Sequence, residues 1–511
     1  MTIEAHDPHH APEQDLKDKG LSHGQVGLFS GVTLGISSVA PAYTLTATLG
    51  LVVLAVGLKM PAIFIAGFIP MLLTAYAYRE LNRVAPDCGT SFTWATKAFG
   101  TYVGWMCGWG LVIATVIVLS NLAGVAVTFF YLFIARLFNN DAIAELAENK
   151  IVNVATCLAF VAIATYVAYR GITTTIHVQV VLVGFQMIVL AMFVIMAFIG
   201  APASPGFTPF SLDWLNPFTG LELSAFVAGL TGSIFAFWGW DVCLTVNEES
   251  KDADRTPGRA ALVAVVTILL TYLLVAIAAI VYAGVGSEGL GLANEETSDN
   301  VFGALAEPVM GSWPALLLFL AVLASSAASL QTTFIPASRT LLAMGTYRAI
   351  PPRFAHMHSR FHTPSFATIA AAVGTGAFYA VLTFLSESVL YDTIASLGIM
   401  ICFYYGITAF ACVWYFRREL FTSASSIVFK LLCPLVGGVI LAWVFYISVY
   451  DSFDPEYGSG ASVGGVGLVF ILAVGILVLG AVLMLIWRVI DPEFFRGETL
   501  KHDTPSLIIE D

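Results

Sequence analysis

Long apolar segments, separated by short polar connections, run through most of the chain. Residues 171–212 and residues 308–338 contain no Asp, Glu, Lys or Arg. Because a helix crosses the hydrocarbon core of a bilayer with about 20 apolar residues, stretches of this length predict membrane-spanning helices. A transmembrane β-barrel would instead show alternating segments of about ten residues. The pattern predicts twelve spans, at residues 26–56, 61–82, 101–135, 151–169, 176–200, 222–247, 260–284, 313–346, 365–385, 390–416, 426–449 and 464–488.

The composition agrees with this pattern and excludes two other classes of protein. Hydrophobic residues make up 58% of the 511 residues and charged residues only 11%, whereas about 25% of the residues of a soluble domain are charged. The 37 Phe and 10 Trp residues exclude a disordered chain. The seven Cys residues form no CxxC pair, and we interpret them as buried apolar side chains.

Charged residues are distributed unequally between the two sides of the predicted bundle. Of the 22 Lys and Arg residues, all except Lys59, Arg136 and Lys150 fall in the tails or in connections on the side of the termini. The positive-inside rule therefore predicts a plasma (inner) membrane protein with both termini in the cytoplasm. The net charge of -12 reflects acidic outer loops and tails. We expect the partners to be the lipid bilayer and a small molecule, with no nucleic acid.

Two of the predicted spans contain residues that interrupt a helix. In the first, Ser37 and Ser38 are followed by Pro41. Proline lacks a backbone N–H, and its ring clashes with the preceding turn of a helix. In the sixth, Gly239 is followed closely by Asp241, with further apolar residues beyond it. A carboxylate at membrane depth is costly and points to a functional site. The alternative interpretation is two helices kinked for packing.

The two interruptions lie five spans apart, which predicts two five-helix halves of opposite orientation. Interrupted helices at corresponding places in inverted halves indicate a transport site. We predict an amino-terminal tail, two repeats, two additional helices and a carboxyl-terminal tail, at residues 1–23, 24–200, 201–420, 421–490 and 491–511.

Four motifs, in the same order and at similar spacing, resemble those of the amino acid–polyamine–organocation transporter superfamily. The segment 80–100 resembles the pattern E-L…P…G-G-x-Y…A-F-G, and 235–241 resembles F-x-F-x-G-F-E. The segment 248–260 resembles E-E-x-K-x-P-x-R-x-x-P-R-A, and 337–364 resembles A-S-R…A-M…G-x-x-P…T-P. The resemblance covers residues 25–420.

This resemblance implies an all-α polytopic membrane protein with a five-plus-five inverted repeat, the leucine-transporter-like fold, plus two carboxyl-terminal helices. It also implies an amino acid permease, which imports or exchanges amino acids or related amines by alternating access and is driven by a cation gradient. Substrate would bind between spans 1 and 6, near spans 3, 8 and 10. The candidate binding residues are Ser37, Ser38, Val39, Ala40, Asn121, Phe235, Ala236, Phe237, Trp238, Asp241 and Tyr405.

The chain departs from the family pattern at the first break, where Ser-Ser-Val-Ala-Pro replaces the usual Gly-Ser-Gly. Fewer glycines leave less room for a close approach of substrate to the backbone. No Lys or Arg lies deep in spans 1, 3, 6, 8 and 10, so we expect a neutral or cationic amino acid or an amine. Phe235 lies where relatives carry an aromatic gate; packing in the core or against lipid is the alternative.

The coupling ion is H⁺ or Na⁺ by resemblance, and no other cofactor is expected. Asp241 either takes part in coupling or bonds to backbone amides as a structural carboxylate. Gln186 aligns where some proton-coupled relatives carry Lys, and an amide cannot carry that charge. In span 8, Ser325, Ser326 and Ser329 offer hydroxyl oxygens toward the first break. A sodium site would use backbone oxygens of Ile36 and Val39 with hydroxyls of Ser325 and Ser326. Close packing between helices also explains those serines.

Other functions fit the sequence less well. No His falls in the middle of a predicted span, as catalysis inside the membrane usually requires. There is neither a TVGYG-like filter nor a P-loop motif. A potassium importer of the same superfamily and a sensor that transports nothing remain alternatives. The charges at 248–259 predict a latch at the cytoplasmic end of span 6 or, alternatively, a solvated loop. The oligomeric state is not predicted.

Overall fold

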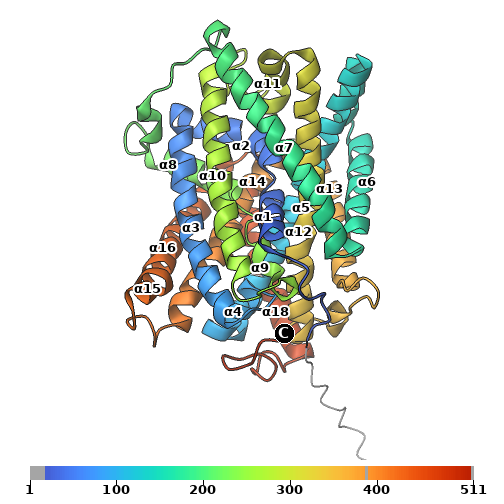
Figure 1. The fold of residues 1–511 in the computed structure, drawn as a ribbon, viewed down its shortest axis with the longest axis vertical. Coiled ribbons are helices and arrows are strands. Elements are labelled where there is room, and N and C mark those ends of the chain that lie inside the picture. The colour runs from blue at the N-terminus through green and yellow to red at the C-terminus, as the bar shows by residue number, and fades with distance from the viewer. Residues whose placement is uncertain (1–17, 386–388, 508–511) are drawn as a thin grey trace, which may run out of the picture.

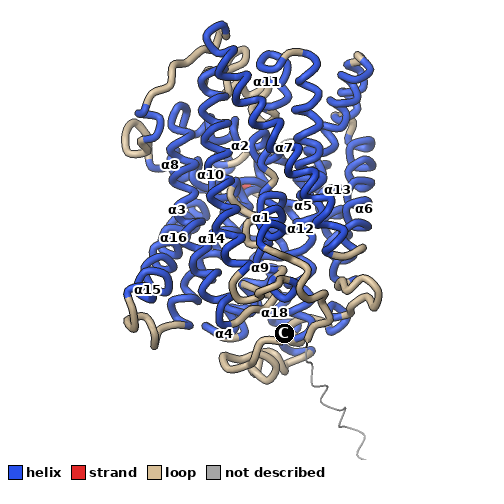
Figure 2. The backbone as a smooth tube through the Cα atoms, viewed as in Figure 1, coloured by secondary structure: helices blue, strands red, loops and turns tan. Residues whose placement is uncertain are grey.

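The computed structural model describes residues 18–385 and 389–507. In these ranges the chain is a bundle of helices joined by loops at its two ends (Figure 1). Helices make up most of it, and a short antiparallel hairpin pairs β1 (Ser462–Val463) with β2 (Val466–Gly467) (Figure 2). The carboxyl terminus lies at the same end as α4 and α9, and α11 lies at the other end (Figure 1). We call these ends the terminal face and the opposite face.

Most of the predicted spans are single long helices. These are α3 (Met60–Val84), α5 (Thr101–Phe138), α6 (Lys150–Tyr169), α7 (Ile172–Gly200), α10 (Thr256–Ala283), α12 (Ser312–Thr346), α13 (Ser365–Leu385) and α14 (Val389–Tyr415). Span 11 consists of α15 (Ala424–Ser426), a π-helical turn (Ile427–Leu432) and α16 (Cys433–Asp451). Span 12 consists of α17 (Leu468–Phe470), a second π-helical turn (Ile471–Gly475) and α18 (Ile476–Ile490). The π-helical turns were not predicted.

Spans 1 and 6 are divided into two helices each. Span 1 consists of α1 (Leu28–Val39) and α2 (Pro41–Val56), and span 6 consists of α8 (Leu223–Ala236) and α9 (Val242–Thr245). Ten helical stretches of the described chain are long and apolar enough to cross a membrane. One of them, Leu28–Val84, contains the first two spans, and the divided span 6 is too short to be counted. These stretches therefore account for eleven of the predicted spans, and the divided span 6 is the twelfth.

Shorter elements connect the spans. Two helices, α4 (Ser91–Phe99) and α11 (Val301–Met310), lie at the terminal and the opposite face respectively (Figure 1). The 3₁₀ turns are Gly57–Lys59, Asp141–Ala147, Ala201–Ala203, Leu212–Leu215, Asn247–Glu249, Pro352–Ala355 and Pro455–Tyr457.

The bundle has a buried centre and an apolar exterior. The parts of the two divided spans nearest the breaks are buried, and α5 packs along α12 beside them. By contrast, Ile163 of α6, Val373 of α13 and Val489 of α18 are exposed. Helices that are apolar all round are stable when lipid covers their outer side. This arrangement encloses the two divided spans within other helices.

Both predicted tails carry buried apolar side chains. Of the amino-terminal tail, residues 1–17 lie outside the described residues; within residues 18–23, Leu21 is buried in a cluster with Cys88 and Phe92. In the carboxyl-terminal tail, Phe494 and Leu500 are buried in the same cluster. Although both tails are mainly polar, these few apolar side chains attach them to the terminal face.

Close packing between α3 and α8 depends on Gly67. A Cβ atom at Gly67 would lie 2.2 Å from the Ser233 Oγ atom, whereas a Cβ at Gly184 would have no heavy atom within 4 Å. We expect Gly67→Ala to reduce the free energy of unfolding by about 2 kcal/mol through overpacking. Gly184→Ala, the matched control, should cause no loss. Thermal unfolding of both variants in detergent tests this; equal melting temperatures would contradict the packing.

Candidate functional site

The break in span 1 occurs at a single residue, Ala40. Its backbone is left-handed, at φ 53° and ψ 67°, and its N–H donates to the carbonyls of Ile36 and Ser37. Pro41 starts α2, where its missing N–H leaves no donor unsatisfied. Of the predicted residues, Ser37, Ser38 and Val39 therefore end α1 and Ala40 makes the break.

The break in span 6 is longer and depends on glycine. The α8 helix ends at Ala236, Gly239 has φ 112°, and α9 begins after Asp241. L-residues rarely adopt this φ value. A Cβ atom at Gly239 would lie 3.0 Å from both the carbonyl carbon and the Oγ atom of Ser38. The two breaks, about 200 residues apart in the sequence, are thus in direct contact.

A glutamine that the sequence analysis did not select joins α1, α7 and α12. The Ser37 hydroxyl donates to Gln179 Oε1 at 2.5 Å. The Gln179 amide nitrogen donates to the Ala328 carbonyl and to Gln331 Oε1, both at 3.2 Å. The predicted residue Gln186 lies seven positions further along α7, buried, with neither amide atom bonded within the described chain. The only signal in the sequence was a second glutamine in the same span.

Hydroxyls of α12 meet the first break, and the predicted Ser329 is one of them. The Ser329 hydroxyl donates to the Ser38 carbonyl at 2.8 Å, and the Thr333 hydroxyl lies 3.5 Å from the Ser38 hydroxyl. These hydroxyls, with Gln179, satisfy most of the polar groups at the end of α1.

The four residues predicted to hold sodium do not form one free oxygen cage. The carbonyl of Ile36 accepts from Ala40 N–H at 3.0 Å, and that of Val39 accepts from the Thr44 hydroxyl at 2.6 Å. Ser325 Oγ accepts from a backbone N–H at 3.3 Å. Only the Ser326 hydroxyl, which is buried, lacks a partner within the described chain. A sodium ion bound here would share three of these oxygens with the hydrogen bonds that they already accept.

The Asp241 carboxylate is buried without a hydrogen bond. Its exposed fraction is 1%, and neither oxygen has a partner among the residues described here. The Tyr405 hydroxyl lies beside it and also lacks a hydrogen bond of proper geometry, as does the indole nitrogen of Trp240. Burying an isolated carboxylate is unfavourable unless it binds a partner or a proton. This group therefore has capacity to bind a donor.

Aromatic rings surround this part of span 6. The ring centroid of Tyr405 is 4.7 Å from that of Tyr404, 5.3 Å from that of Trp240 and 5.5 Å from that of Tyr78. Ring faces attract cations because of their quadrupole. Asp241 and Tyr405, predicted from separate spans, are thus brought together with rings from α3 and α14 beside them.

The remaining candidates of span 6 mainly pack within the protein. The Trp238 indole N–H donates to the Tyr404 hydroxyl. The Ala236 carbonyl accepts from the Tyr272 hydroxyl at 2.6 Å, and the Phe237 ring contacts the Tyr272 ring. Phe235 is buried as well.

Asn121 lies apart from the breaks, in a cavity of about 1070 Å³ at the opposite face. Its Oδ1 atom accepts from the Thr393 hydroxyl at 2.9 Å, and its amide nitrogen is buried without a partner in the described ranges. The carboxylates of Glu148 and Asp299 and the ring of Tyr391 also line this cavity. Asn121 therefore belongs to a vestibule separate from the break.

Buried ion pairs connect distant segments at the terminal face. Arg339 of α12 binds both carboxylate oxygens of Glu249, the shortest contact being 3.0 Å. Glu248 binds Lys19 instead, at 2.6 Å. The 248–259 motif was predicted to form a latch, and two of its glutamates make buried ion pairs. Their partners are Arg339 and Lys19, from distant segments, and not the neighbouring basic residues of the 248–259 motif.

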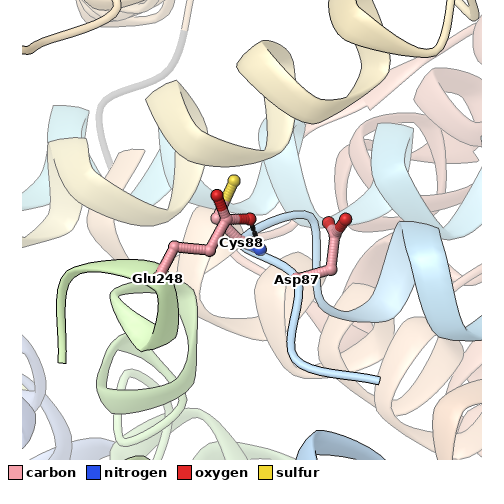
Figure 3. Close-up of side chains that lie close together, drawn as sticks. All are labelled: Asp87, Cys88 and Glu248. Carbon is pink, nitrogen blue, oxygen red and sulfur yellow. Dashed lines mark hydrogen bonds between the residues drawn. The ribbon is translucent and has the colours of Figure 1, made fainter. Parts of the chain in front are cut away.

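Three potential metal ligands gather at this latch: Asp87, Cys88 and Glu248, drawn in Figure 3. The Cys88 backbone N–H donates to Glu248 at 2.8 Å (Figure 3). The ammonium of Lys19 bridges the two carboxylates, at 2.7 Å from Asp87 and 2.6 Å from Glu248. Burial favours neutral lysine, but the two carboxylates outweigh it and hold the pKa of Lys19 well above its usual value. The charged ammonium of Lys19 therefore lies between the two carboxylates and offsets one of their two negative charges.

Comparison with known proteins places the chain among transporters. A family model described as amino acid permease matches residues 26–482. An uncharacterized transporter of Mycobacterium tuberculosis is 27% identical over 476 residues, which covers 90% of this chain and 92% of the relative. The low-affinity putrescine importer PlaP of Escherichia coli is 26% identical over 231 residues, 45% of this chain and 47% of the relative.

A solved structure shares the fold. MhsT, crystallised in complex with L-phenylalanine, superposes with a TM-score of 0.59 at 14% sequence identity, and the match covers 81% of this chain and 98% of MhsT. This likeness supports the predicted leucine-transporter-like fold.

Contact between the two breaks depends on the missing side chain at Gly239. We expect Gly239→Ala to cost about 1–3 kcal/mol of backbone strain and to push α1 away from span 6. Gly57 also has positive φ (55°), but a Cβ atom there would meet nothing within 4 Å, so Gly57→Ala is the matched control for strain alone. Thermal unfolding and substrate uptake are the measurements. Equal uptake by both variants would contradict a functional role for the contact.

Proposed function

The chain belongs to the amino acid permease family. From this premise we propose that it transports a cationic amino acid or an amine. The observation that carries the proposal is the buried Asp241 carboxylate, which has no hydrogen-bond partner in the described chain. An ammonium group supplies both the charge and the N–H donors that this carboxylate lacks. The PlaP relative is named as an importer of putrescine, a diamine, which is consistent with this choice.

The aromatic rings around Asp241 favour a cation for a second reason. Tyr405, Trp240 and Tyr78 lie edge to face or tilted against one another beside the carboxylate. They exclude water, which strengthens an ion pair, and they offer ring faces to an ammonium. A carboxylate-bearing side chain of an acidic substrate would be repelled at the same place.

Transport proceeds by alternating access in this proposal. A vestibule at the opposite face extends toward α5, and buried ion pairs close the terminal face. Spans 1 and 6 rock about the contact between Gly239 and Ser38, with the terminal face in the cytoplasm. The energy comes from a cation gradient or from exchange. Asp241 is the proposed coupling residue, since Gln186 cannot carry a proton.

Uptake into proteoliposomes tests substrate and coupling together. The labelled panel contains neutral, cationic and acidic amino acids, polyamines and rubidium, with a proton gradient, a sodium gradient or neither. We expect uptake of a cationic amino acid or amine. Asp241→Asn should reduce that uptake at least about tenfold, because a charged hydrogen bond at a buried site is lost. Asp241→Glu should retain part of it.

Several outcomes would contradict the proposal. Uptake of neutral amino acids alone, unaffected by Asp241→Asn, would exclude recognition of an ammonium by this carboxylate. Uptake of rubidium alone would favour the potassium importer. No uptake by a preparation that unfolds cooperatively on heating would favour the sensor.

A further inference from the structure

A primary ammonium is bound on the terminal face, and it belongs to the chain itself. The Lys19 Nζ atom is fully buried and contacts Asp87 Oδ2 at 2.7 Å and Glu248 Oε1 at 2.6 Å. The Tyr347 ring centroid lies 5.5 Å from the same nitrogen, and the Tyr347 hydroxyl donates to Asp87 at 2.7 Å. Two carboxylates and a ring face together form a complete ammonium site.

The segment that delivers this ammonium is short and is attached along its length. We call residues 18–27 the amino-terminal strap. Leu21 is buried in the cluster around Cys88, and the backbone N–H groups of Gln25 and Val26 both donate to the Glu249 carbonyl. The Lys251 N–H donates back to Val26. The strap leads directly into α1, so movement of α1 on this face moves Lys19.

The other components come from two further elements of the terminal face. Asp87 lies in the loop between α3 and α4, and Glu248 lies in the turn that follows α9. Lys19 therefore links both divided spans to the α3–α4 loop. If these elements move apart at the terminal face, the Lys19 ammonium must leave at least one of its two carboxylate partners.

Removal of Lys19 alone would leave two buried carboxylates next to each other. An unpaired buried charge is strongly unfavourable, so a cation or protons must replace the lysine. Glu248 Oε2 already lacks a hydrogen-bond partner among the described residues. The site thus has an acceptor available for an incoming N–H donor before Lys19 has left.

We propose that Asp87 and Glu248 form a second binding site for primary ammonium groups, which Lys19 fills in this conformation and a cationic substrate fills when the strap withdraws. The Lys19 side chain ends in the same alkylammonium group that a diamine or a lysine side chain carries. Substrate would exchange with Lys19 at this site on its way between Asp241 and the terminal face. The identity of the substrate rests on the proposed function; the ammonium site itself does not.

Chemical rescue of the purified full-length Lys19→Ala variant tests the site. The reporter is Cys88, which is fully buried and adjacent to Asp87. Its modification by a methanethiosulfonate reagent is followed by peptide mass spectrometry, so that the other six cysteines do not interfere. We expect Lys19→Ala to label Cys88 at least about tenfold faster than the unmodified chain, because loss of one partner breaks a buried ion cluster.

Addition of n-butylammonium should restore the slow labelling and raise the melting temperature of Lys19→Ala. Tetramethylammonium has the same charge but no N–H donor, and it should do neither. The variant Lys19→Ala with Glu248→Gln should lose the rescue. If Lys19→Ala fails to fold, Lys19→Met, which keeps the apolar stem of the side chain, replaces it in the same experiment.

Two results would overturn the inference. The first is that n-butylammonium and tetramethylammonium protect Cys88 to the same extent, or that neither protects it. The second is failure of the transported cationic substrate to protect Cys88 in Lys19→Ala. Because the rescue by n-butylammonium involves no transport, it separates the two proposals: a chain that takes up only neutral amino acids would still show it.

Discussion

Interruption of two helices at membrane depth is possible here because each interruption is enclosed by other helices. In hydrocarbon, an unsatisfied backbone N–H or carbonyl costs several kcal/mol. At the end of α1, the Ser38 carbonyl accepts from the Ser329 hydroxyl, and Gln179 accepts from Ser37. At span 6, the Ala236 carbonyl accepts from Tyr272. The position of α7, α10 and α12 around the divided spans follows from this need.

Buried charges follow two different arrangements in the same molecule. At the terminal face, Lys19 and Arg339 form ion pairs with acidic groups, and each of these pairs holds separate segments together. At the centre, Asp241 lies among aromatic rings without a neutralising residue of the described chain beside it. Paired buried charges favour one conformation, whereas an unpaired one favours a bound ligand or proton. In the proposed mechanism, paired buried charges close the pathway at the terminal face, and the unpaired Asp241 recognises the substrate within it.

The amino-acid pattern was sufficient for the spans and for both breaks. Pro41 and Gly239 each impose a local backbone constraint, so their effect can be predicted without knowledge of the neighbouring helices. The pattern located the inner face of α7 but not the depth along it, because Gln179 and Gln186 lie two helical turns apart on one face. On α12 it predicted Ser325, Ser326 and Ser329 together without choosing among them. Only the packing of α1 against these helices selects Gln179 and, among the serines, Ser329.

The role of Lys19 could not be predicted because its partners, Asp87 and Glu248, are 68 and 229 residues away.

The junction of α1, α7 and α12 through Gln179 has a consequence for the voltage dependence of the conformational change. An amide carries no net charge, so displacement of this junction across the bilayer transfers no charge through the membrane field. Moving one elementary charge through 100 mV changes the free energy by about 2.3 kcal/mol. Any voltage dependence of the conformational change must therefore arise elsewhere, from Asp241, from the ion pairs or from the transported molecule.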